Sequence, residues 1–141
     1  MKVVVSACLL GENCKYNGGN NFSQEVADFV QGREVIPVCP ERLAGLGIPR
    51  EPIEIVEGIV RRKDGTSVDD ALRRAIQEIL AQLEGQDIEC VILKSRSPTC
   101  GVKQVYDGTF SGTLVDGMGV LAAALQEKGY KVIDCEDCRC K

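Results

Sequence analysis

The chain has 141 residues, the usual length of one domain with a single hydrophobic core. Its net charge is -4 and aromatic residues make up 4% of the sequence, so we expect no binding of duplex nucleic acid and no platform of stacked bases. Met1 and Lys2 lead straight into a short apolar run, no signal peptide is visible, and no apolar run is long enough to span a membrane. We therefore expect a cytoplasmic protein. We also expect it to be a monomer or a homodimer.

The first half of the chain contains two predicted strands, over residues 2–6 and 34–38. Between them lie a glycine-rich polar loop and a short helix, which Ser23 should cap and Gly32 should end. Residues 40–52 are studded with glycine and proline, and we expect an irregular functional loop there. Residues 53–60 are typical of a small hairpin or a bent edge strand.

The second half begins with the clearest helix, from Ser67 to Glu84, in which apolar residues recur at helical spacing. A third strand is predicted over 88–94, a turn-rich segment over 95–116, a helix over 117–128 and a fourth strand over 130–133. Strands that alternate with amphipathic helices predict an α/β fold. We therefore expect a single domain over residues 1–134, followed by a cysteine-rich tail over residues 135–141. The domain should contain a mostly parallel, Rossmann-like sheet of about four strands, with flanking helices and a small hairpin.

Three of the eight cysteines follow predicted strands: Cys8, Cys39 and Cys100. Ligands of open α/β sheets gather outside the carboxyl ends of the strands, so these thiols should meet at one edge. Cysteines in a reducing compartment serve more readily as metal ligands or catalytic thiols than as disulfides. A [4Fe–4S] cluster normally takes four thiolates, and three would leave one iron open to substrate. The spacing therefore favours a catalytic cluster.

The other cysteines leave alternatives open. Cys135 also follows a strand, with Cys138 and Cys140 close behind, and one of these could complete a closed four-cysteine site. Such a site would make the chain a non-catalytic iron–sulfur protein, or a zinc-binding module if zinc took its place. We expect the tail to be loose or auxiliary, because termini anchor ligands poorly. Cys90 lies inside an apolar run and is expected to be a core residue.

Short motifs along nearly the whole chain resemble the DUF523 family. They are Ser6–Gly11, Lys15–Gly18, Pro37–Glu41, Pro49–Arg50, Leu93–Ser95, Ser97–Gly101 and Tyr106–Gly112. The family includes thiouracil desulfidases, which replace sulfur by oxygen on thiolated bases or nucleotides with a [4Fe–4S] cluster held by three cysteines. Cys14 and the cysteine-rich tail depart from the simple family pattern.

The resemblance implies roles for particular residues. Cys8, Cys39 and Cys100 would hold the [4Fe–4S] cluster, and Glu41 and Ser97 would be the catalytic acid–base pair. The chemistry is consistent with this, because a soft thiocarbonyl sulfur prefers a thiolate-ligated iron to a hard cation. The small-molecule substrate, a thiolated pyrimidine base or nucleotide, could be held by cationic and hydroxyl side chains near the motifs. The candidates for substrate binding are Lys15, Tyr16, Arg50, Lys94 and Ser95.

Overall fold

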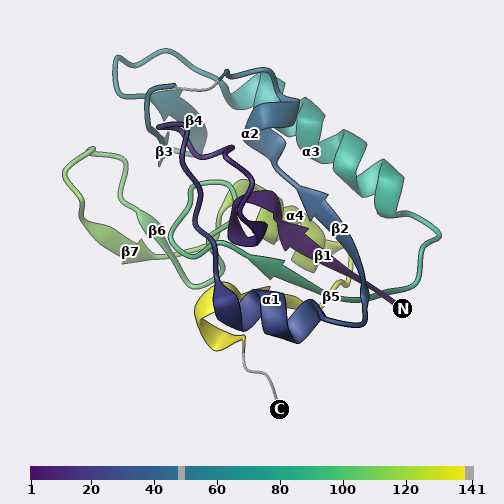
Figure 1. Ribbon diagram of the computed structural model, residues 1–141. Coiled ribbons are helices and arrows are strands. Elements are labelled where there is room, and N and C mark those ends of the chain that lie inside the picture. The colour runs from purple at the N-terminus through teal and green to yellow at the C-terminus, as the bar shows by residue number, and fades with distance from the viewer. Residues whose placement is uncertain (48–49, 139–141) are drawn as a thin grey trace.

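A four-stranded parallel sheet forms the centre of the protein (Figure 1). The computed structural model describes residues 1–47 and 50–138. The sheet contains β1 (Lys2–Ser6), β2 (Glu34–Val38), β5 (Ile88–Leu93) and β8 (Val132–Asp134), in the order β2-β1-β5-β8. The predicted α/β fold with a parallel sheet of four strands is confirmed.

Alternate residues of β1 face two separate hydrophobic cores, as the period of two in a strand requires. Val4 packs with residues of α3 (Asp69–Leu83) and α4 (Val120–Glu127), such as Leu72 and Leu121. Val3 and Val5 point the other way and pack with Val26 of α1 (Gln24–Val30). The helices therefore cover both faces of the sheet and leave the ends of its strands accessible.

Two short elements lie where the sequence predicts irregular chain. Helix α2 (Pro40–Leu43) starts directly after β2, with proline at its first position, where a missing N–H costs nothing. The turn-rich segment contains a hairpin of β6 (Gln104–Tyr106) and β7 (Leu114–Asp116). Four-residue helices and three-residue strands are too short to show a period, which explains why both were missed. The predicted hairpin is present as β3 (Ile53–Val56) and β4 (Ile59–Arg62).

Two 3-10 turns follow strands of the sheet: η1 (Ala7–Leu10) after β1 and η2 (Cys135–Asp137) after β8. The described part of the tail packs against the domain, because Cys138 is only 3% exposed and belongs to the same core as Val3 and Val5. Ion pairs also join Glu136 to Arg96 and Asp137 to Lys103. Within the described residues, we find no helix of the length and apolarity needed to cross a membrane.

Candidate active site

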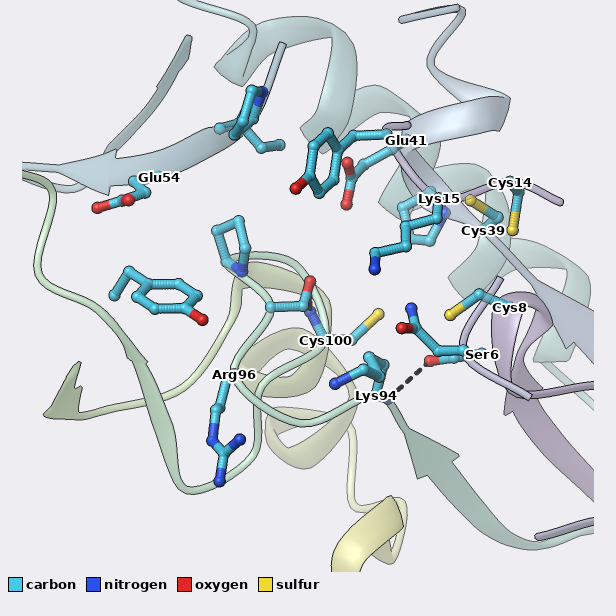
Figure 2. Close-up of a pocket in the computed structure, with 18 of the residues that line it drawn as sticks. Ser6, Cys8, Cys14, Lys15, Cys39, Glu41, Glu54, Lys94, Arg96 and Cys100 are labelled. Atoms are coloured by element: carbon cyan, nitrogen blue, oxygen red, sulfur yellow. Dashed lines mark hydrogen bonds between the residues drawn. The ribbon is translucent and has the colours of Figure 1, made fainter. Parts of the chain in front are cut away.

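A cavity of about 590 Å³ opens at the carboxyl edge of the sheet, beyond the ends of β1, β2 and β5 (Figure 2). This volume is typical of a pocket for a small ligand. All ten site residues expected from the sequence line it: Cys8, Lys15, Tyr16, Cys39, Glu41, Arg50, Lys94, Ser95, Ser97 and Cys100. These ten residues lie in the segments that follow three adjacent strands.

The side chains of Cys8, Cys39 and Cys100 point into the same region of this cavity (Figure 2). Cys8 lies in η1, Cys39 links β2 to α2, and Cys100 lies in the loop after β5. Since β1 lies between β2 and β5, the three loops are neighbours in space. Cys100 is 7% exposed, and the other two thiols are half-buried.

The surroundings of Cys8 and Cys100 raise the pKa of both thiols. Burial raises the pKa of Cys100, and negative charge on Cys8, Glu41 and Cys39 raises it further, against a hydrogen bond with Ser6 that lowers it. Burial also raises the pKa of Cys8, which a hydrogen bond with Asn21 and the charge of Lys94 lower. A nearby positive charge would therefore be needed to keep Cys8 and Cys100 deprotonated.

The loop that carries Cys100 is held rigidly from two sides. The Ser97 hydroxyl accepts hydrogen bonds from the backbone N–H groups of Thr99 and Cys100, both at 3.1 Å. At the start of α4, the N–H of Leu121 donates to the carbonyl of Thr99 at 2.8 Å. Gly119 lies so close to this carbonyl that any Cβ would collide with it. Ser97 and Gly119 thus fix the position of the Cys100 thiol.

Glu41 is held by partners at both of its carboxylate oxygens. Arg50 donates to Oε1 through Nε at 3.2 Å and Nη2 at 3.1 Å, and the hydroxyl of Thr99 donates to Oε2 at 3.1 Å. The Arg50 side chain is only 5% exposed, and Thr99 is completely buried. Sequence reasoning did not single out Thr99, although it lies inside the Ser97–Gly101 motif. The carboxylate therefore keeps one orientation in the cavity.

Other polar side chains are arranged around this centre. The ammonium of Lys94 donates to the carbonyl and the hydroxyl of Ser95 at 3.0 and 3.1 Å. Lys15 lies 5.8 Å from the centre of the Tyr16 ring, a weak cation–π contact. The two hairpins and their flanks supply further lining residues: Glu54, Lys63, Tyr106 and Phe110. Arg96 also lines the cavity, from the loop that follows β5.

Comparison with known proteins places the fold and the cavity in a family. The family model described as 2-thiouracil desulfurase matches residues 3–137. The chain belongs to this family. An uncharacterized protein of Bacillus subtilis strain 168, YbbK, is 36% identical over 141 residues, with 93% of each chain covered. A solved structure of the [4Fe–4S]-dependent thiouracil desulfidase TudS is 33% identical with a TM-score of 0.87, covering 96% of this chain and 91% of that one.

The remaining cysteines of this family member fall into two places. Cys14 lines the cavity and is 2% exposed. Cys90 is 3% exposed in the core on the α1 side of the sheet, as expected, and Cys135 and Cys138 pack in the same core. Neither described tail cysteine lines the cavity, and Cys140 lies outside the described residues. The fourth thiol in the cavity is therefore Cys14.

Proposed function

We propose that this protein is a [4Fe–4S]-dependent desulfidase that replaces sulfur by oxygen on thiouracil-type bases or nucleotides and releases sulfide. The observation that carries this proposal is the convergence of Cys8, Cys39 and Cys100 on a cavity that also holds an oriented carboxylate, Glu41. Membership of the 2-thiouracil desulfurase family and the likeness to TudS support the substrate class and the cofactor.

The sulfur atoms of Cys8, Cys39 and Cys100 are suitable ligands for a [4Fe–4S] cluster. Thiolates are the ligands that iron–sulfur clusters prefer, and these three line one cavity. Among the residues that the structure describes, no three thiol or carboxylate side chains are close enough to hold a single metal ion. The ligands of a four-iron core stand further apart, because the core itself separates them. Cys8, Cys39 and Cys100 would therefore each bind one iron, and a fourth iron would face the substrate.

When bound, the cluster would supply a soft Lewis acid that binds the thiocarbonyl sulfur and makes its carbon electrophilic. Glu41 would accept the proton of the attacking water, since its carboxylate faces the cavity and needs only hydrogen-bond reach to do so. We assign Arg50 to the orientation of Glu41 rather than to a substrate phosphate. Its guanidinium already donates to Glu41 and to the carbonyls of Cys14 and Gly47.

Ser97 keeps a proton to donate. A hydroxyl has one donor and two acceptor positions, and the two backbone N–H groups of its loop occupy the acceptor positions. Its O–H is therefore available to a ring nitrogen or a departing group in the cavity. Lys15, Tyr16, Lys94 and Ser95 would hold the rest of the substrate, with the two ammonium groups suited to the phosphate of a nucleotide.

The test is reconstitution with iron and sulfide without oxygen, followed by measurement of both elements in the protein. We then expect sulfide release from 2-thiouracil, 4-thiouracil or their nucleotides, with the matching oxo-pyrimidine as product. Running the reaction in ¹⁸O-labelled water should place the label in that product, because water supplies the oxygen in a hydrolytic reaction. A loaded cluster without turnover on any of these probes would favour a closed, non-catalytic iron–sulfur site.

A further inference from the structure

Cys14 is a buried thiol in the cavity that the proposed reaction does not use. Two of the other cavity thiols form hydrogen bonds with side chains that are not cysteines. Cys100 has the hydroxyl of Ser6 as its partner, and Cys8 has the amide of Asn21. Cys14 differs, because its side chain forms a hydrogen bond with Cys39, and Figure 2 shows the two side chains next to each other. Cys14 and Cys39 are therefore two cavity thiols in direct contact with each other.

Two arginine side chains hold the segments that carry Cys14 and Cys39 next to each other. The guanidinium of Arg50 donates to the carbonyl of Cys14 at 2.9 Å. Arg42, in the helix that follows Cys39, forms an ion pair with Glu12 at 3.0 Å, which ties this helix to the loop that carries Cys14. The loop consists of turns rather than a helix or strand, so it can adjust to the short approach that a disulfide needs.

The two thiols differ in access. Cys39 is half-buried and faces the cavity, whereas Cys14 is 2% exposed. An oxidant that enters the cavity would therefore meet Cys39 first, with Cys14 already in contact behind it. A reactive cysteine with a second cysteine beside it is the arrangement of a reversible redox pair.

We propose that Cys14 is the resolving partner of Cys39 and that the two form a disulfide when the cluster is lost under oxidising conditions. Peroxide would convert the Cys39 thiol to a sulfenic acid with release of water. The Cys14 sulfur would then attack that sulfur and expel a second water, so two thiols and one peroxide give one disulfide and two waters. The role of Cys39 as a cluster ligand, on which this inference rests, belongs to the proposed function.

The disulfide would have two effects on the cavity. It would remove Cys39 from the set of available ligands, so the oxidised chain could not take up a cluster. It would also protect Cys39 from oxidation to sulfinic or sulfonic acid, which thiol reductants do not reverse. A reductant would restore both thiols, and the site could then be loaded again.

The experiment uses the full chain stripped of iron, reduced, and then treated with hydrogen peroxide. Cleavage after glutamate separates the relevant cysteines, because Glu12 lies between Cys8 and Cys14. We expect mass spectrometry without reduction to join the peptide of residues 13–25 to that of 35–41 as the main cross-link. A main cross-link from Cys39 to Cys8 or Cys100, or no cross-link at all, would overturn the proposal without affecting the desulfidase assignment.

Two serine variants test whether the disulfide preserves the ability of the protein to bind a cluster again. Before oxidation, Cys14→Ser should take up iron like the wild type, since the three proposed ligands remain. After peroxide and then reductant, it should recover several-fold less iron, because Cys39 has been irreversibly oxidised. Cys135→Ser, a half-buried thiol outside the cavity, should recover like the wild type. A Cys14→Ser protein that recovers fully would refute the protective role, and one that never binds iron would show that Cys14 is a ligand instead.

Discussion

The seven cysteines that the structure describes divide between two regions that burial alone does not distinguish. Cys14 and Cys100, beside the cavity, are 2% and 7% exposed, and Cys90 and Cys138, in the core on the α1 side, are both 3% exposed. The neighbours differ instead. The cavity thiols form hydrogen bonds with one another, with the Ser6 hydroxyl or with the Asn21 amide. The others pack among the apolar side chains of β1 and β5, such as Val3 and Ile92.

This contrast shows what turns a buried cysteine into a candidate ligand. In an apolar core, a thiol acts as a small hydrophobic group. In the cavity, thiols have polar hydrogen-bonding partners, and several of them line the same space. A serine substitution should therefore have different effects in the two regions, because it removes a soft ligand in one and inserts a hydroxyl among apolar groups in the other.

The largest effect is expected from Cys100→Ser compared with Cys90→Ser. Cys100→Ser should lose iron and sulfide release together, because a serine oxygen is a poor substitute for a soft thiolate. Cys90→Ser should keep the wild-type iron content and lose roughly 1–3 kcal/mol of unfolding free energy, the cost of burying an unpaired hydroxyl. Iron analysis and urea unfolding of both variants check this. Equal iron loss in the two would remove the distinction between the regions.

Glu41→Gln should separate catalysis from cluster binding. Glutamine is nearly isosteric with glutamate and provides no thiolate, so iron content and visible spectrum should match the wild type. Turnover should fall by about 10²–10⁴-fold, the usual contribution of a positioned general base. The measurement is steady-state sulfide release from a thiouracil nucleotide. A near-normal rate would remove Glu41 from the mechanism and leave another group to activate the water.

Thr99→Val tests whether the orientation of Glu41 matters. The valine removes the hydroxyl that donates to Oε2 but keeps the side-chain shape. We expect kcat to fall by roughly 10- to 100-fold, in line with a hydrogen bond to a charged group, with little change in KM because Thr99 does not line the cavity. Thr99→Ser keeps the hydroxyl and should restore most of the rate. If the valine and serine variants have equal rates, the hydroxyl has no such role.

The smallest effect is expected from Cys138→Ala. The thiol lies in the core on the α1 side, so its removal should lower the unfolding free energy by about 1 kcal/mol and leave iron content and turnover unchanged. Thermal unfolding and iron analysis of the reconstituted protein measure the two quantities. Loss of the cluster in this variant would instead favour the closed four-cysteine site that the sequence left open.

Local sequence patterns are enough to predict the architecture and the edge of the sheet at which the site lies. Strand and helix periods are local, so β1, β2, β5 and α3 were predicted close to their observed bounds. Parallel strands present their carboxyl ends together, so the sequence predicts that Cys8, Cys39 and Cys100 meet at one edge of the sheet, and they line one cavity there. The short α2 and the β6–β7 hairpin were missed, because elements of three or four residues carry no readable period.

The contacts between side chains depend instead on how distant segments pack together. The hydrogen bond from Thr99 to Glu41 joins residues 58 positions apart, and no local pattern encodes such a pair. The contact between Cys14 and Cys39 likewise depends on how the loop after β1 folds over the end of β2. The placement of Cys138 away from the cavity follows from the packing of η2 on the sheet. Sequence periodicity specifies which face of an element is buried, whereas side-chain partners depend on the packing of distant segments.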